Sequence, residues 1–287
     1  AYEIRLSLVG SEMCIRDRSR INLAAPSGSA RGMLLRVANR LGTLGINITR
    51  AYVDTITMGG GTSILILSAV VIGPDGLRIC PESTLWRDLR RDLLRLKWLE
   101  TEPIELGYRV PELGLGGADV LMTYADLAHQ LLVKSNRYVY SRARIREIAV
   151  EQMPLSLALV RLFLDRFDPQ KRIDEGEYRE RAEAVRVTIS ETASDQVTGA
   201  VLETILDAIG ATLKTNYFIE GRYALALRLA PEAIMETAPR PETPFGVFWV
   251  HGRGFNAFHL RFRDTARGGV RVVKPASNEQ HVRESER

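Results

Sequence analysis

The residues whose types and spacing could best hold a ligand lie in the stretch "RFRDTARGGVRVVKPASNEQ", in which Arg267 and Arg271 bracket Gly268 and Gly269. An arginine guanidinium can donate two parallel hydrogen bonds to one carboxylate. A glycine beside it lets a ligand lie against backbone N–H groups, because no Cβ is in the way. The combination suits a small dicarboxylate or another anion. A solvated turn between two strands would have the same letters, so the pattern alone leaves both interpretations open.

Other patterns that could carry chemistry are weaker. The glycines of residues 112–119, "ELGLGGAD", do not have the G-x-G-x-x-G spacing of a dinucleotide-binding loop, so this segment is predicted to be a linker. His129 lies among leucines in a helical pattern, which favours a packed or surface histidine over a ligand. His251 and His259 have no carboxylate or cysteine between them and give only weak support for a metal site.

Composition and charge narrow the class of protein. The chain has 287 residues, 45% hydrophobic and 26% charged, which is typical of globular proteins and suggests roughly two domains. Its formal charge of +4 comes from scattered arginines rather than a basic block, which favours small anions over nucleic acid as partners. Cys14 and Cys80 show no metal spacing and no disulfide framework, so we expect a cytoplasmic protein. No apolar run reaches the ~18 residues of a membrane span, so none is expected.

The first residues differ in pattern from the rest. Residues 2–19, "YEIRLSLVGSEMCIRDRS", resemble the translation of sequencing-adapter DNA. The alternative is an ordinary amphipathic lead-in with a strand around residues 4–9. We expect residues 1–18 to be such an artefact and therefore foreign to the fold.

The periodicity of residues 19–110 predicts an α+β domain. Hydrophobic spacing indicates the order strand, helix, strand, strand, helix, strand, which is the ferredoxin-like βαββαβ arrangement. The last strand of this order is predicted within "PIELGYRV", residues 103–110. On the strand over residues 46–56, the alternation predicts that Ile46, Ile48, Tyr52 and Ile56 are buried.

Residues 111–193 are predicted to form a helical linking region. Pro154 suits the first turn of one helix, and Asp168-Pro169 suits its end. A further helix follows, and after Lys214 the pattern changes to strands, including two strands around the turn "HGRG" at residues 251–254. Residues 194–287 are therefore predicted to begin a mixed α/β domain.

A first resemblance covers the N-terminal domain. The segment "GMLLRVANRLGTLGINITRAYVDTI" resembles ACT regulatory domains, in which a glycine opens the first helix and "LGxLGINI" leads into the second strand. The resemblance implies an ACT-like domain over residues 19–110 that binds a small-molecule effector or promotes oligomerisation. A structural ferredoxin-like domain without a ligand remains the open alternative.

A second resemblance covers the C-terminal part. The segments "KTNYF", "YALALRLAP" and "VHGRGFNAFHLRFRDTARGGVRVVKPASNEQH" are similar, in order and spacing, to the start of the catalytic region of large NAD-specific glutamate dehydrogenases. The resemblance implies that Arg267 binds the side-chain carboxylate of glutamate and that Gly268 and Gly269 let the substrate approach. Arg271 matches a downstream basic residue with a supporting role. Shorter enzymes of the superfamily have a lysine at the position of Arg267.

The resemblance also implies an activity, a cofactor and an assembly. The whole enzyme would convert L-glutamate to 2-oxoglutarate and ammonia with NAD, as a cytoplasmic homo-oligomer. Lys214 and Lys274 lack the glycine-flanked context of the family's catalytic lysine, and no NAD-binding domain is recognisable. We therefore expect a fragment that contains no catalytic residue. The alternative is a non-enzymatic ACT-type regulatory protein that binds an amino acid.

Overall fold

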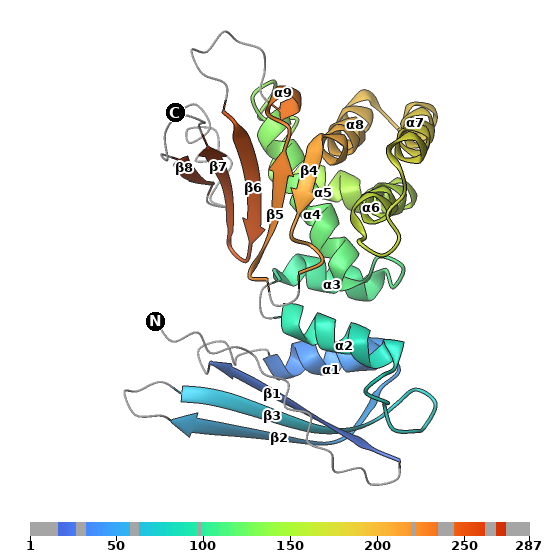
Figure 1. Cartoon of the computed structure of the whole chain (residues 1–287), viewed down its shortest axis with the longest axis vertical. Helices are drawn as coiled ribbons and strands as arrows, with labels where there is room; N and C mark the ends of the chain where they lie inside the picture. Colours follow the sequence, from blue (N-terminus) through green and yellow to red (C-terminus); the bar gives the residue numbers. More distant parts are fainter. Residues whose placement is uncertain are drawn as a thin grey trace. The chain divides into compact units, whose positions relative to one another are not determined.

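The computed structural model describes residues 17–26, 33–57, 63–96, 99–219, 222–234, 244–261 and 268–273 (Figure 1). The chain divides into two compact units, Ala1–Trp98 and Leu99–Arg287. Each contains helices and one antiparallel sheet, so the predicted α+β class is confirmed. The predicted artefact over residues 1–18 and Cys14 lie almost entirely outside the described residues, which begin at Asp17.

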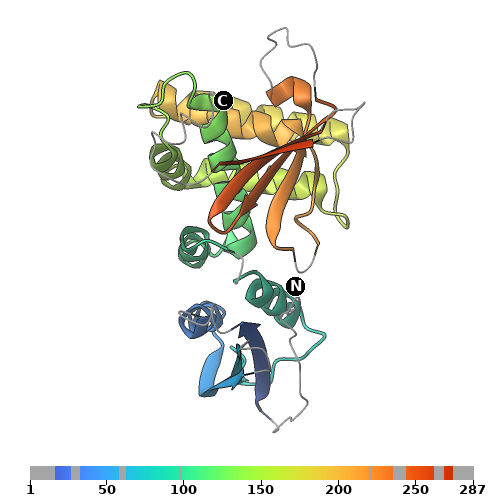
Figure 2. The ribbon, with the colours of Figure 1, turned by 90° about the vertical axis from the view of Figure 1, so that its left-hand side faces the viewer.

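The first unit packs two helices on a small sheet. The sheet has the order β1-β3-β2 with antiparallel pairing at both contacts, and the helices lie together on one face of it (Figure 2). Leu41 from a helix and Val71 from the sheet are fully buried in its core. The elements are β1 (Ser19–Pro26), α1 (Met33–Thr43), β2 (Asn47–Thr57), β3 (Ser63–Ile72) and α2 (Thr84–Arg95).

Strand β2 is more exposed than its alternation predicts. Ile46, just before the strand, is buried as predicted, but Tyr52 is 49% and Ile56 51% exposed. The strand lies at an edge of the described sheet, so a partner strand covers it on one side alone. Residues 49–57 are exposed on both faces of the strand. The alternation predicted the strand correctly, but it could not show that the helices leave this strand uncovered.

The predicted strand over residues 103–110 is wrong, because Thr101–Arg109 forms helix α3. Alternating apolar residues suggested a strand, but Pro103 occupies the first helical turn, where proline is tolerated. Gly107 packs directly on the next helix, since a Cβ there would lie 2.8 Å from the carbonyl oxygen of Gly114. The last strand of the ferredoxin-like order is therefore not formed by these residues.

The second unit joins a helical layer to a five-stranded sheet. Its sheet has the order β4-β5-β6-β7-β8, with every neighbouring pair antiparallel, and the helices cover one face of it (Figure 2). The helices are α3, α4 (Gly114–Leu132), α5 (Arg142–Glu151), α6 (Met153–Phe167), α7 (Glu175–Thr192), α8 (Gln196–Ala211) and α9 (Pro231–Ile234). The strands are β4 (Thr212–Thr215), β5 (Ala224–Leu229), β6 (Gly246–Gly252), β7 (Phe255–Arg261) and β8 (Gly268–Val273).

Helix α4 is the central element of this unit and is buried along most of its length. It begins at Gly114, so the predicted linker over residues 112–119 is wrong. The glycines there allow close packing instead, and Gly114 takes a positive φ of 60° at the helix start. On the sheet side, the buried indole of Trp249 donates a hydrogen bond to the backbone oxygen of Thr123, at 3.2 Å. This contact fixes α4 against the middle of β6.

Several local predictions are confirmed in this unit. Pro154 lies in the first turn of α6, and the helix ends at Phe167 with Asp168 as its cap residue. Strands β6 and β7 pair around the turn "HGRG", in which Gly254 has a φ of 77°. A left-handed conformation of this kind is the one that favours glycine over other residues.

Candidate functional site

The stretch predicted to hold a carboxylate is described in part. Arg267 lies outside the described residues. Gly268, Gly269 and Arg271 belong to β8, so the two glycines open a strand. In its register with β7, Gly268 is opposite Arg261, Gly269 opposite Leu260 and Arg271 opposite Phe258. The roles assigned to these four residues stay predictions.

Strand β8 is an edge of the described sheet. In an antiparallel pair, alternate residues of an edge strand direct their N–H groups away from the neighbouring strand. Because Gly268 and Gly269 have no side chains, an anion could approach such an N–H group closely. One of the two glycines therefore directs its N–H group away from β7.

A second constellation, which the sequence did not predict, surrounds Asp126 on α4. Its carboxylate is almost fully buried and accepts two hydrogen bonds from Arg142, at 2.9 and 2.8 Å. Arg146 donates two more, both at 2.8 Å, and the amide of Asn256 donates a fifth at 2.8 Å. Two adjacent turns of α5 and the start of β7 are thereby tied to one carboxylate.

Two further carboxylates complete the constellation. Arg146 donates to Glu100 at 3.2 Å and to Glu102. Arg142 forms an ion pair with Glu100 at 3.5 Å. We call these residues the Asp126 cluster: Glu100, Glu102, Asp126, Arg142, Arg146, His251 and Asn256.

The charges of the Asp126 cluster stabilise one another. Burial alone would raise the pKa of Asp126, but the hydrogen bonds and charges of Arg142 and Arg146 hold that pKa well below its usual range. Burial alone would lower the pKa of Arg146, but the charge of Asp126 and the hydrogen bonds to it outweigh burial. The pKa of Arg146 is therefore raised above its usual value. Asp126 is thus ionised at any physiological pH and has its lone pairs occupied, which does not suit a general base. Its role is to hold elements together.

The cluster also fixes the orientation of His251. Because the amide nitrogen of Asn256 donates to Asp126, its oxygen faces the Nδ1 atom of His251, at 2.7 Å. The Nδ1 atom of the buried imidazole therefore donates a hydrogen bond to this oxygen. His251 and Asn256 are opposite each other in β6 and β7, so the cluster locks the register of this hairpin.

The histidines considered as metal ligands do not converge. His259 stacks on Phe248, its register partner in β6, at 5.5 Å between ring centroids. Since Phe248 and His251 are three residues apart in one strand, His251 and His259 point to opposite faces of the sheet. His129 is the packed residue that was predicted, with Nδ1 2.9 Å from the oxygen of Tyr140. Within the described ranges, no group of three potential ligands could hold a metal ion.

The sequence contained one signal for the buried charges. Asp119 and Asp126 are seven residues apart in an otherwise apolar helix, which places both on one face. A buried carboxylate needs a partner, and Asp119 has one in Arg222, at 2.6 Å. The partners come from distant parts of the chain, so the sequence alone could not name them.

The Asp126 cluster and the glycine pair lie at opposite ends of β7. Asn256 is opposite Val273, whereas Arg261 is opposite Gly268. The five residue steps from 256 to 261 correspond to about 17 Å of extended strand. The cluster can therefore fix the strands that carry Gly268 without touching a ligand held there.

Comparison with known proteins identifies the relatives. Residues 187–280 match the family model for the catalytic domain of bacterial NAD-glutamate dehydrogenases. Over this part of its length, the chain is similar to NAD-specific glutamate dehydrogenases. This finding does not favour the alternative of a non-enzymatic regulatory protein.

Individual glutamate dehydrogenases agree with the family match. The NAD-specific glutamate dehydrogenase of Saccharomyces cerevisiae is 47% identical over 73 residues, 25% of this chain and 7% of the relative. Glutamate dehydrogenase 2 of Dictyostelium discoideum is 26% identical over 162 residues, 55% of this chain and 15% of the relative. The NAD-specific glutamate dehydrogenase of Halomonas elongata is 32% identical over 152 residues, 50% of this chain and 9% of the relative. The chain thus matches only a small part of the length of these relatives.

The described sheets differ from the sheet of a doubly wound dinucleotide site. Such a site needs parallel βαβ units with a glycine-rich turn before a helix. Within the described ranges, both sheets pair their neighbouring strands in the antiparallel sense. No described helix is long and apolar enough to cross a membrane.

Proposed function

We propose that this chain provides the beginning of the substrate domain of an NAD-dependent glutamate dehydrogenase. The whole enzyme would convert L-glutamate, NAD⁺ and water to 2-oxoglutarate, ammonium, NADH and a proton. The observation that carries the proposal is the catalytic-domain match over residues 187–280, which includes Arg267, Gly268 and Gly269. We assign NAD binding to other parts of the enzyme, since the relatives are far longer than the matched segment.

Within this domain, we assign Arg267 to the side-chain carboxylate of glutamate. A guanidinium binds a carboxylate with two hydrogen bonds, and its planar geometry selects the carboxylate over neutral groups. Gly268 and Gly269 would let the substrate lie against the edge of β8. Arg271 would support the site from the same strand. The Asp126 cluster would act at a distance by fixing β7, on which β8 pairs.

We further propose that the first unit is an ACT-like domain that binds a small effector or associates with another copy of the protein. The βαββα order, the strand order β1-β3-β2 and the helices on one face support a ferredoxin-like arrangement. The cytoplasmic location and the homo-oligomeric state belong to the same proposal.

Steady-state kinetics of the full-length enzyme test the role of Arg267. We expect Arg267→Ala to raise the KM for glutamate about 10- to 100-fold, because a charge-assisted hydrogen bond is worth about 1.5–3 kcal/mol. The KM for NAD should not change. Arg172→Ala, on the exposed segment between α6 and α7, is the matched control and should behave as wild type. An unchanged KM for glutamate in Arg267→Ala would refute the assignment.

A further inference from the structure

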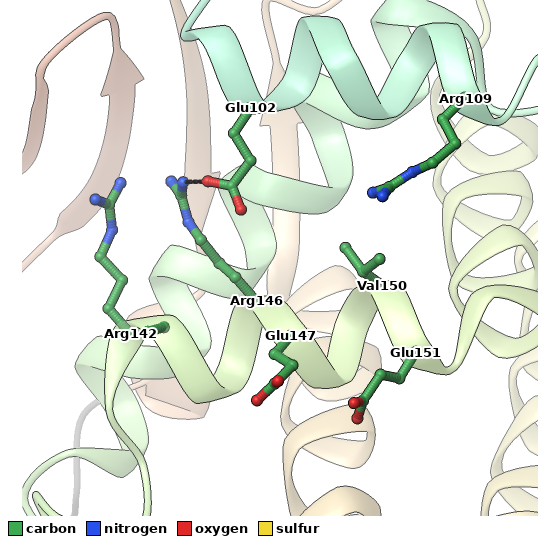
Figure 3. Close-up of a pocket in the computed structure, with 8 residues that line it drawn as sticks. Glu102, Arg109, Arg142, Arg146, Glu147, Val150 and Glu151 are labelled. Atoms are coloured by element: carbon green, nitrogen blue, oxygen red, sulfur yellow. Dashed lines mark hydrogen bonds and ion pairs between the residues drawn. The ribbon is translucent and has the colours of Figure 1, made fainter.

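A pocket of about 540 Å³ lies between α3 and α5 in the second unit (Figure 3). This volume is within the range of small-molecule sites. Both helices supply charged side chains to it, and α5 also supplies two small apolar ones. The lining residues are Glu102, Arg109, Arg142, Ala143, Arg146, Glu147, Val150 and Glu151.

Each of the two helices places two side chains, seven residues apart, along this pocket. Glu102 and Arg109 are seven residues apart on α3, so they lie on one face, about 10.5 Å apart along the axis. In Figure 3 both extend from α3 into the space above α5. Ala143 and Val150 are also seven residues apart and place an apolar strip of α5 opposite them. The pocket thus has an acid at one end, a base at the other and an apolar floor.

The cations of the pocket differ in their availability. Arg142 and Arg146 are committed to Asp126 and to Glu100. Arg109 is exposed and makes no hydrogen bond or ion pair with another residue of the described ranges. Arg109 is therefore the lining guanidinium that can receive a ligand carboxylate without breaking an existing bond.

The acids of the pocket differ in the same way. Glu147 and Glu151 are paired with Arg144, at 2.8 and 3.5 Å, and their carboxylates point away from Arg109 (Figure 3). The Oε2 atom of Glu102 accepts a hydrogen bond from Arg146. Its Oε1 atom accepts no hydrogen bond from a described residue and faces the pocket (Figure 3). This oxygen can accept a hydrogen bond from an ammonium group.

We propose that this pocket binds a free α-amino acid in its zwitterionic form. The carboxylate pairs with Arg109, the ammonium group with Glu102, and the side chain lies along Ala143 and Val150. A simple anion would meet the carboxylate of Glu102, and a simple cation would meet the guanidinium of Arg109. A molecule that carries both charges satisfies both ends. This inference is independent of the proposed function, because it uses neither Arg267 nor β8.

Thermal-shift and calorimetric titration of the 287-residue chain test the proposal. The probes are the standard L-amino acids at millimolar concentration, with glutarate and n-butylamine as ligands that lack one of the two charges. We expect at least one amino acid to bind while glutarate and n-butylamine do not. Arg109→Gln should weaken that binding about tenfold or more, since it removes a charge-assisted contact. Glu102→Gln should weaken it as well.

Arg172→Gln serves as the matched control, because Arg172 is exposed and remote in sequence from the pocket. It should bind as wild type does. Arg109→Gln should keep the wild-type melting temperature without ligand, since Arg109 has no described partner to lose. The proposal is overturned if no amino acid binds, if binding survives Arg109→Gln, or if glutarate or n-butylamine binds equally well.

A further variant separates this pocket from the predicted glutamate site. Binding that persists in Arg267→Gln and is lost in Arg109→Gln supports the pocket between α3 and α5. The reverse pattern, loss in Arg267→Gln alone, would overturn this inference and support the proposed function. The two proposals can therefore fail separately.

Discussion

Two buried carboxylates, one in each unit, respond to burial in opposite ways. Asp92 in α2 and Asp126 in α4 are both almost fully buried, and each contacts arginine. Burial raises the pKa of Asp92, and the charge and hydrogen bond of Arg40 offset only a part of that effect. At Asp126, the arginines outweigh burial and lower the pKa.

The difference follows from the number of donors. Asp92 receives a hydrogen bond from Arg40. Asp126 receives two each from Arg142 and Arg146 and one from Asn256. Both carboxylates lose water, but only Asp126 regains a full set of hydrogen bonds to its ionised form. Ionised Asp92 therefore lowers the stability of the first unit. Ionised Asp126 instead holds together α4, α5 and the β6–β7 hairpin of the second unit.

The largest expected effect is that of Asp126→Asn on stability. Removing the charge leaves Arg142 and Arg146 buried without their main partner, which costs about 3–5 kcal/mol of unfolding free energy. Urea unfolding monitored by circular dichroism measures it. Asp165→Asn, which breaks an exposed pair with Arg181, should cost less than about 1 kcal/mol. Equal losses in the two variants would contradict the special role of Asp126.

Asp92→Asn should cost less stability than Asp126→Asn, and the two should differ in the sign of their pH dependence. The pKa of Asp126 is lowered by folding, so its contribution to stability is present above the unfolded pKa of about 3.9 and is lost as the pH falls from there toward the folded pKa. The pKa of Asp92 is raised, so the folded state binds its proton more tightly. Its contribution is largest at low pH and decreases as the pH rises through the folded pKa.

Hydrogen exchange followed by mass spectrometry can report on the two units separately between about pH 5 and 3. The stability difference between wild type and Asp126→Asn should shrink as the pH falls. As the pH falls, the stability of the wild type should increase relative to that of Asp92→Asn. Parallel trends for both variants would show that the number of donors does not decide the sign.

A smaller effect is expected at His129. Burial lowers its pKa, while its hydrogen bond to Tyr140 and the charge of Asp126 oppose this in part. The folded state therefore favours the neutral ring, and its contribution to stability is lost as the pH falls through the unfolded value of about 6.5. Between about pH 7.5 and 5.5, His129→Gln should remove a slope of at most about 1.4 kcal/mol per pH unit. If the unfolding free energy of the variant had the same slope against pH, a group other than His129 would be responsible for it.

What the sequence predicted well is what local chemistry determines. The "HGRG" turn, Pro154 and Asp168-Pro169 mark boundaries through residues that are adjacent in the chain. Residues 103–110 were assigned wrongly, because the alternation of apolar side chains there arises from packing against α4 rather than from a strand. No local pattern carries this information.

The candidate sites show the same limit. The "RGG" stretch was visible because its residues are contiguous and resemble a known family. The Asp126 cluster unites Glu100, Arg142 and Asn256 with Asp126, and only the fold brings such distant residues together. The pocket is lined in part by α3, where the sequence pattern had predicted a strand instead of a helix.

Arg267 is assigned to the distal carboxylate of glutamate, and substrate discrimination by the full-length enzyme tests this assignment. L-Norvaline lacks that carboxylate but keeps the α-amino acid end. Wild type should prefer glutamate over norvaline strongly in kcat/KM, since its guanidinium is left unpaired by norvaline. In Arg267→Ala the preference should collapse, with the activity toward norvaline nearly unchanged. An undiminished preference for glutamate in the variant would show that another group binds the distal carboxylate.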